Sequence, residues 1–269
     1  MPARVQLTVV GSINIDLVAR VDRLPRAGET IEAADLARFP GGKGANQAVA
    51  AARLGAEVRM IGALGDDAFA DEALAGLREA AVELAVERVP TTTGVALILV
   101  DAQGDNQIVV VAGANARVEP PRVDGAVLCQ LEVPDAVVLA AAEGASFFAL
   151  NAAPARAIDV EPDVLVVNEL EHELVSRGRL VAVTYGAKGA ALFQDGREVA
   201  RASPPDVQAV DPTAAGDAFT ACLVVSLLED RAPAEALARA CAAGAVAASR
   251  LGAQPSLPTA AEVDEILAR

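Results

Sequence analysis

The sequence is poor in aromatic residues. Its 269 residues contain no tryptophan, one tyrosine and six phenylalanines, yet 53% of the residues are hydrophobic. A core must therefore be built from alanine, valine and leucine, and side chains of this size let helices pack closely on a sheet. A chain of this length can bury most of its surface in one large α/β domain without disulfides or structural metals.

Cysteine and histidine are also scarce. The three cysteines, Cys129, Cys222 and Cys241, lie far apart and form no CxxC pair, which argues against a zinc site and against a disulfide framework. The only histidine, His172, lies between two glutamates in a segment that we interpret as an exposed helical turn. A hydrolase with a Ser-His-Asp or Cys-His centre would have to use this histidine, so that class is disfavoured.

Basic residues are outnumbered by acidic ones, 22 to 37, which gives a net charge of −15. Such a chain repels polyanions, which predicts no nucleic-acid partner. Nucleotides are still possible ligands, because backbone N–H groups and a metal ion can hold phosphates. No apolar run reaches membrane-spanning length without charge or glycine, and Met1 to Val10 is too short and strand-like for a signal peptide. We expect a cytoplasmic protein without membrane contact.

Only two of the 22 basic residues are lysines. Both lie in glycine-rich segments, Lys43 in GGKG and Lys188 in GAKG. A compact ammonium group and a planar guanidinium are not interchangeable at a tight site. The two lysines are therefore candidate ligand-binding residues, although chance can also leave two.

Short apolar runs alternate with helical patterns along the chain. We predict strands over Val5–Val10, Val58–Ala63, Ala126–Leu131, Ser146–Leu150, Val164–Val167 and Leu180–Thr184. We predict helices over Gly44–Leu54, Asp67–Ala80, Ala215–Leu228 and Ala234–Ser249. This alternation predicts a parallel sheet with helices on both faces. Two further β-rich runs, Val95–Val100 and Gln107–Val111, flank a turn-forming segment and predict a hairpin.

The segment with the strongest chemical signal is Asp211–Phe219, which is followed by an apolar helical run. Small residues before a helix leave its first N–H groups free, and these donors together with the helix dipole form an anion site. Asp217 lies in the first turn, where a carboxylate can act as a cap or as a base. The sequence alone leaves both roles open.

A second segment, Phe39–Gln47, is glycine-rich but is not a P-loop, because Lys43 is followed by glycine where serine or threonine would hold magnesium. Its glycines permit close approach of the backbone to a ligand, and Lys43 and Asn46 can hydrogen-bond hydroxyl groups. An ordinary turn between loop and helix is the alternative. Asn168 and Glu171 follow a predicted strand and carry oxygen ligands suited to magnesium.

These segments resemble, together and in order, those of the ribokinase family, the PfkB-type carbohydrate kinases. The resemblance covers essentially the whole chain and rests on Gly11–Asp16, Pro40–Val49, Met60–Asp67, Gly113–Asn115, Gln130–Glu132, Thr213–Asp217 and Gly252–Ser256. It implies one ribokinase-like, doubly wound α/β domain over residues 1–269. It also implies a small β-sheet lid with strands from about 16–39 and 95–111, and a homodimer formed through that lid.

The resemblance further implies a phosphotransferase that uses ATP, Mg²⁺ and K⁺ to convert D-ribose into D-ribose 5-phosphate. Asp217 would be the base, and the N–H groups of Ala214, Ala215, Gly216 and Asp217 would stabilise the phosphoryl group. The sugar would contact Asn14, Asp16, Gly42, Lys43, Asn46, Glu132 and Asp217. The nucleotide would contact Asn168, Thr184, Gly186, Lys188, Gly189, Gly216 and Cys241. Magnesium would be held, through water, by Asn168 and Glu171, and potassium by Asp211, Thr213, Ala247, Gly252 and Ser256.

The chain departs from the family pattern at Pro212, Ala152 and Cys241, which stand where many members have threonine, proline and asparagine. There is little room for a helix between Gly113 and Leu131, and Glu169–Arg179 is barely long enough for a crossover. Other functions therefore stay open: a kinase for another pentose, deoxyribose or a nucleoside, or a shortened binding protein without turnover. A Rossmann dehydrogenase is disfavoured, because no GxGxxG follows the first strand.

Overall fold

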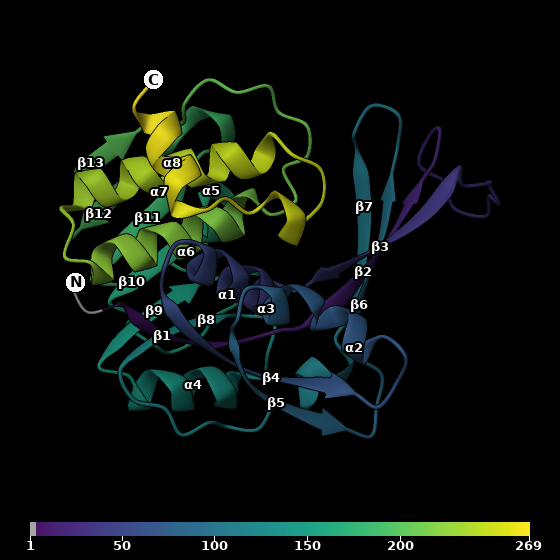
Figure 1. Cartoon of the computed structure of the whole chain (residues 1–269), viewed down its shortest axis with the longest axis horizontal. Helices are drawn as coiled ribbons and strands as arrows, with labels where there is room; N and C mark the ends of the chain where they lie inside the picture. The colour runs from purple at the N-terminus through teal and green to yellow at the C-terminus, as the bar shows by residue number, and fades with distance from the viewer. Residues whose placement is uncertain (1–3) are drawn as a thin grey trace.

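The computed structural model describes residues 4–269. Its main sheet has nine strands in the order β13-β12-β11-β10-β9-β8-β1-β4-β5 (Figure 1). The strands are β1 (Gln6–Val10), β4 (Glu57–Gly65), β5 (Glu83–Val89), β8 (Ala126–Gln130), β9 (Phe147–Asn151), β10 (Val164–Asn168), β11 (Leu180–Thr184), β12 (Ala190–Gln194) and β13 (Arg197–Ala202).

Neighbouring strands are parallel from β5 through β11, and β12 and β13 extend the sheet as an antiparallel hairpin. The predicted α/β class with a mostly parallel sheet is thus confirmed. The chain proceeds from β1 to β4 and β5 on one side and later to β8 and beyond on the other. Ligand crevices of open α/β sheets form where the strand order reverses in this way, here at the carboxyl ends of β1 and β8.

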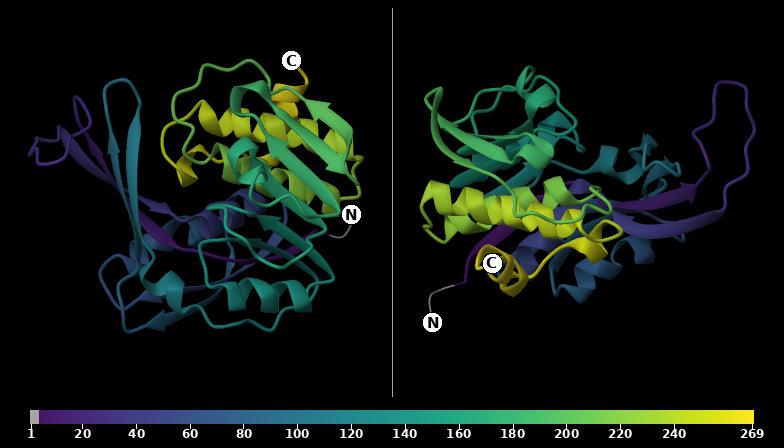
Figure 2. Two further views of the ribbon diagram at one scale, coloured as in Figure 1. Left: turned by 180° about the vertical axis from the view of Figure 1, so that it is seen from behind. Right: turned by 90° about the horizontal axis from the view of Figure 1, so that it is seen from above.

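A second, four-stranded sheet projects from the body of the molecule (Figure 2). We refer to it as the lid sheet. Its order is β3-β2-β6-β7, with bounds β2 (Asn14–Arg20), β3 (Asp35–Gly41), β6 (Gly94–Val100) and β7 (Asn106–Val111). The hairpin of β6 and β7 is as predicted, and Asp101 closes its turn by accepting the N–H groups of Gln103 and Asp105.

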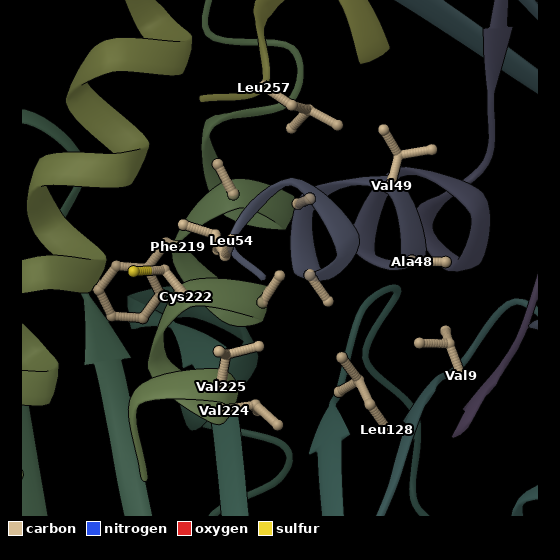
Figure 3. Close-up of a cluster of buried hydrophobic side chains, with 14 of the residues drawn as sticks. Val9, Ala48, Val49, Leu54, Leu128, Phe219, Cys222, Val224, Val225 and Leu257 are labelled. Carbon is tan, nitrogen blue, oxygen red and sulfur yellow. The ribbon is translucent and has the colours of Figure 1, made fainter. Parts of the chain in front are cut away.

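Four of the helices, α1, α6, α7 and α8, cover one face of the main sheet (Figure 1). Figure 3 shows α1 and α6 side by side above the strands, with Val49 of α1 and Val224 of α6 among the buried side chains. The longer helices are α1 (Lys43–Arg53), α4 (Asp135–Gly144), α6 (Ala215–Leu228), α7 (Pro233–Ala248) and α8 (Ala260–Leu267). No helix described within residues 4–269 is long and apolar enough to cross a membrane.

The opposite face is covered mainly by α4 and by loops. The two segments that are short for the family contain little helix: α5 (Glu169–His172) is a single turn, and residues 118–125 contain none. Val118 and the partly buried Val123, Ile158 and Val160 pack from loops against the strands instead. The expected lack of room for a longer helix in these segments is therefore confirmed, and loop side chains cover the strands there.

The predicted single helix over Asp67–Ala80 is wrong. The segment forms two short helices, α2 (Ala70–Ala73) and α3 (Ala75–Glu79). Asp67 lies outside both, because its carboxylate accepts the N–H and hydroxyl of Thr93 and the N–H of Phe69. The acidic residue thus joins the end of β4 to the start of β6. Short 3₁₀ turns complete the fold: η1 (Gly113–Arg117), η2 (Gly186–Lys188) and η3 (Gln254–Ser256).

Candidate active site

The predicted site residues converge at the carboxyl edge of the parallel strands. Ser12, Glu132, Asn151, Asn168 and Thr184 lie at or just after the ends of β1, β8, β9, β10 and β11. The first turns of α1 and α6 meet at the same edge, where side chains of α1 donate hydrogen bonds to Asp217. Parallel strands present their last residues on one edge, which explains why distant motifs come together here.

The start of α1 is pressed against the loop that follows β1. Gly42 has a φ of 88°, and a methyl group on it would lie 2.8 Å from the Asn14 nitrogen and 2.9 Å from the Ser12 carbonyl. The Ser12 carbonyl accepts the N–H of Ala45 at 2.9 Å, and the Ser12 hydroxyl accepts that of Gly44 at 3.3 Å. Only glycine permits this close approach, which carries Lys43 and Asn46 into the site.

Asp217 is 6% exposed, and both carboxylate oxygens are held by α1. Asn46 Nδ2 donates to Oδ2 and Gln47 Nε2 donates to Oδ1, each at 2.9 Å. The carboxylate makes no capping bond to α6, so the capping alternative for Asp217 is wrong. Burial raises the pKa of Asp217, while Lys43 and the two amide donors oppose the rise.

The first N–H groups of α6 face open space. Within residues 4–269 the N–H groups of Gly216 and Asp217 have no backbone acceptor, whereas that of Ala215 donates to the Pro212 carbonyl at 3.1 Å. A methyl group on Gly216 would meet no atom within 4 Å. Free donors at the positive end of a 14-residue helix form an anion site beside the Asp217 carboxylate.

Asp16 lies on β2 of the lid sheet and is 7% exposed. Its carboxylate packs against Gly41, and no residue from 4 to 269 donates a hydrogen bond to it. Burial, Glu132 and Asp217 raise the pKa of Asp16 to about 7, although Lys43 lowers it. A buried carboxylate without a protein donor is costly, unless a ligand supplies the missing hydroxyl groups.

Asn14 lies on the same face of β2 as Asp16, since side chains alternate along a strand. Asn14 Oδ1 accepts from Asn115 Nδ2 at 2.7 Å, and Asn115 Oδ1 accepts the N–H of Ile13 at 2.9 Å. Asn115 therefore orients the Asn14 amide so that its NH₂ group is left to donate to a ligand.

We predict that Asp16→Asn stabilises the free protein at pH 8. The folded pKa of about 7 lies above the unfolded value of 3.8, so the folded state favours protonated Asp16 and loses stability as pH rises from about 4 to 7. A shift of about three pH units lowers the free energy of unfolding of the native chain by up to about 4 kcal/mol at high pH. The uncharged amide of the variant does not cause this loss. Thermal unfolding at several pH values should show the melting temperature of the variant exceeding that of the native chain by several degrees at pH 8 and converging with it near pH 4. A variant that melts at or below the native temperature at pH 8 would contradict this assignment.

Glu132 and Lys43 complete the charged cluster. Glu132 Oε2 accepts from the Ser12 hydroxyl at 2.5 Å and from the backbone N–H of Lys43 at 3.2 Å. Burial lowers the pKa of Lys43, but the surrounding carboxylates, led by Asp217 and Glu132, outweigh it and raise the pKa above its usual value. The ammonium group therefore stays charged beside Asp217.

Two cavities adjoin at this cluster. A cavity of about 470 Å³ lies between η2, the loop before α6, and α7, and its lining includes Gly186, Gly189 and Cys241. A smaller cavity of about 150 Å³ is lined by Lys43, Asn168, Glu171 and Asp217 among others. Thr184 and Gly216 line both. The larger cavity thus leads to the free N–H groups of α6 and to the Asp217 carboxylate.

Two of the residues predicted to contact the nucleotide, Lys188 and Cys241, differ in their relation to the larger cavity. Lys188 is exposed in η2 and does not line the larger cavity. Cys241 lines it, and burial raises the pKa of its thiol to about 11, so that the thiol is neutral at physiological pH. The thiol donates to the Ala202 carbonyl at 3.7 Å, so the cavity wall at this position presents a neutral sulfur atom.

The residues predicted for magnesium form a capping box at the start of α5. Asn168 Oδ1 accepts the Glu171 N–H and Glu171 Oε2 accepts the Asn168 N–H, both at 2.8 Å. No group of three or more His, Cys, Asp or Glu suited to a metal is present in the described part of the chain. The remaining lone pairs of Asn168 and Glu171 in the smaller cavity fit a magnesium ion that keeps its waters and binds substrate phosphates.

The residues predicted for potassium come together only in part. Asp211 joins two loops, because its carboxylate accepts the N–H and hydroxyl of Thr213 and, at 2.9 Å, the N–H of Gly252. Ala247 is buried in α7, and the buried Ser256 hydroxyl donates to a carbonyl in its own turn. A carboxylate is an oxygen ligand of the kind that hard cations prefer.

Several residues of the site were not predicted as site residues. Gln47, Asn151 and Gln130 are buried and hydrogen-bonded in a network behind Asp217, and Ser12 and Asn115 orient Glu132 and Asn14. Most of them lie within the segments on which the family resemblance rests. Polar side chains in otherwise apolar or glycine-rich segments were the available signal.

A cavity that opens onto free helix N–H groups beside a buried carboxylate is an arrangement suited to phosphoryl transfer on an α/β fold. Comparison with known proteins agrees. The family model described as pfkB family carbohydrate kinase matches residues 5–157 and 135–260. The chain therefore belongs to the pfkB family of carbohydrate kinases.

Three relatives cover nearly the whole chain. A ribokinase of Lactococcus lactis is 37% identical over 288 positions, covering 96% of this chain and 95% of its own length. A deoxyribokinase of Salmonella typhi is 34% identical, covering 97% and 98%. The structure of Arabidopsis thaliana ribokinase complexed with ribose and ATP superposes with a TM-score of 0.84 at 31% identity, covering 98% and 99%. An alignment of 288 positions exceeds the 269 residues of this chain, which agrees with its shortened segments.

Proposed function

We propose that this carbohydrate kinase transfers the γ-phosphate of ATP to the primary hydroxyl of D-ribose, giving D-ribose 5-phosphate and ADP. The observation that carries the proposal is the junction of the two cavities at Thr184 and Gly216, next to Asp217, with the unpartnered Asp16 carboxylate nearby. Similarity to ribokinases over nearly the full length supports the choice of sugar. Deoxyribose is the second candidate, because a deoxyribokinase is also similar over nearly the whole chain.

In the proposed reaction Asp217 takes the proton of the primary hydroxyl. The hydroxyl oxygen attacks the γ-phosphorus as the bond from that phosphorus to the β-phosphate oxygen breaks, and ADP leaves. The free N–H groups of Gly216 and Asp217 and the Lys43 ammonium stabilise the charge on the phosphoryl group in transfer. Ala215 contributes less, because its N–H already donates to Pro212.

The sugar is held between the lid sheet and α1. Asp16 accepts hydroxyl hydrogens, Asn14 donates its NH₂ group, and Asn46 presents a buried Oδ1 that has no partner within the described chain. Glu132 and Lys43 supply an acceptor and a donor, and Gly42 contacts the sugar through its backbone. This arrangement offers both donors and acceptors to a polyhydroxylated ligand.

The nucleotide occupies the larger cavity. We assign its base and ribose to the walls at Gly186, Gly189 and Cys241, its phosphates to Thr184 and Gly216, and a surface contact to Lys188. Magnesium, when bound, neutralises phosphate charge, and Asn168 and Glu171 would hold it through water. ATP as the phosphoryl donor is consistent with a cytoplasmic location.

We further propose that potassium binds at Asp211, with Thr213, Ala247, Gly252 and Ser256 around it, and activates the enzyme. The bridge from Asp211 to Gly252 supports this, because a cation there would fix the loop that precedes α6 and its N–H groups. The rate in potassium chloride should exceed the rate in tetramethylammonium chloride of equal ionic strength. Equal rates in the two salts would contradict activation by a bound cation.

We propose that the protein is a homodimer that buries the outer face of the lid sheet. Leu17, Leu97, Leu99 and Val109 line an apolar groove there, and Leu36 is 66% exposed. An exposed apolar face of this kind is typical of a protein interface. A second copy would cover it by symmetric packing of the two lid sheets.

ADP release should be measured with ATP and a panel of ribose, 2-deoxyribose, other pentoses, hexoses and nucleosides. The proposal predicts the highest kcat/KM for ribose. A higher value for 2-deoxyribose would establish the second candidate instead. Absence of sugar-dependent ADP release across the panel would show a binding protein without turnover.

A further inference from the structure

Gln47 contacts the carboxylate that the mechanism uses as its base. It lies in α1 next to Asn46 and is fully buried. Its Nε2 donates to Asp217 Oδ1 and to Asn151 Oδ1, each at 2.9 Å. Both hydrogens of the amide therefore have acceptors, one in Asp217 and the other in Asn151 at the end of β9.

The orientation of the Gln47 amide is fixed by a second glutamine. Gln130 Nε2, at the end of β8, donates to Gln47 Oε1 at 2.6 Å. Asn151 is held in turn by a bond from its Nδ2 to the Val166 carbonyl at 3.2 Å. A rotated Gln47 amide would bring its oxygen against the acceptor oxygens of Asp217 and Asn151 and its NH₂ group against that of Gln130, so only one orientation satisfies this network.

We propose that Gln47 is a positioning residue for Asp217, an inference that rests on the proposed function. Gln47 and Asn46 each hold one carboxylate oxygen from consecutive positions of α1, which fixes the plane of the carboxylate. Each oxygen keeps a further lone pair for the sugar hydroxyl. Donation from Gln47 also favours the ionised form of Asp217, which is the form that accepts a proton.

The charges around Asp217 make this donation important. Lys43 is the cation that faces Asp217, while Glu132 and Asp16 are carboxylates that oppose its ionisation. Burial opposes ionisation as well. With one cation set against two carboxylates and burial, the neutral donors Gln47 and Asn46 help to keep Asp217 ionised near neutral pH.

The test is the pH profile of kcat at saturating ribose between pH 5 and 9 in the full-length protein, because the expected titration of Asp16 acts on KM for ribose. Gln47→Met keeps the side-chain length and removes the donors. We expect its acidic limb to move up by about one pH unit, so that kcat falls by up to about tenfold on that limb and recovers as pH rises toward 9. Gln47→Glu keeps the shape and adds a carboxylate, and its limb should move further in the same direction.

Ser226→Ala is the matched control, because it removes a buried polar side chain further along α6. Its acidic limb should coincide with that of the native chain, and thermal unfolding checks the folding of all three variants. A loss of the same size at every pH in both Gln47 variants, or an unchanged profile, would overturn the positioning role. A native chain without sugar-dependent turnover would instead overturn the proposed function, and this inference with it.

Discussion

Asp217→Asn is expected to lower kcat for ribose phosphorylation by about 10²–10⁴-fold, the contribution of a positioned base. The amide is almost the same size but cannot accept the hydroxyl proton. It also leaves one of the two amide donors of Asn46 and Gln47 without its acceptor. Steady-state kinetics in ATP and ribose measure the effect, and calorimetry should find ribose binding within a few-fold of the native value.

The control for this substitution is Asp230→Asn, which changes an exposed aspartate just beyond the end of α6. Its kcat should equal that of the native chain. If Asp217→Asn retains a near-native kcat, Asp217 is not the base. If it loses ribose binding and turnover together, the carboxylate holds the sugar rather than the proton.

Asp16→Ala is expected to raise KM for ribose by about 10- to 100-fold, because buried sugar hydroxyls lose a charged acceptor. KM for ATP should stay within a few-fold, since the nucleotide cavity does not include Asp16. The preference for ribose over 2-deoxyribose should narrow as well, because 2-deoxyribose lacks one of the hydroxyls that Asp16 can bind. Steady-state kinetics with each sugar and with ATP measure these changes.

The pKa of Asp16 adds a second readout. With a pKa of about 7, the carboxylate is half protonated at neutral pH in the free protein. A ribose hydroxyl donates to the ionised form, so KM for ribose in the native chain should fall as pH rises through 7. Asp16→Ala should abolish this dependence. An unchanged ribose KM in the variant, or an equal rise of KM for ATP, would show that Asp16 does not anchor the sugar.

The strands and the major helices followed from the sequence because their signals are local. The Val164–Val167 run and the segment Ala215–Leu228 carry their own hydrophobic patterns and small-residue boundaries, and the structure has them at nearly the predicted bounds. The prediction of one helix over Asp67–Ala80 was wrong because Asp67, which resembled the start of a helix, instead accepts hydrogen bonds from the distant Thr93. Strands β5 and β13 were missed because their partly exposed, charged sequences resemble surface loops. Strand β12 was also missed, although its five residues are uncharged and mostly buried.

The candidate site was predicted where a motif carries its own chemistry. Asp16, Lys43 and Asp217 lie in segments whose residue types and glycines indicate ligand contact, and the structure brings them into one charged cluster. The residues behind the cluster could not be predicted. The bond from Gln47 to Asp217 spans 170 positions of sequence, and only the packing of α1 against α6 creates it. The sequence around a glutamine in a helix does not indicate which distant carboxylate its side chain will contact.

The most direct test is a ³¹P NMR time course of the native chain with ATP, magnesium, potassium and D-ribose. The account predicts that the γ-phosphate resonance of ATP disappears while the resonances of ADP and of ribose 5-phosphate grow in equal amounts. An unchanged ATP spectrum would contradict the account, and so would inorganic phosphate as the only new phosphoryl product.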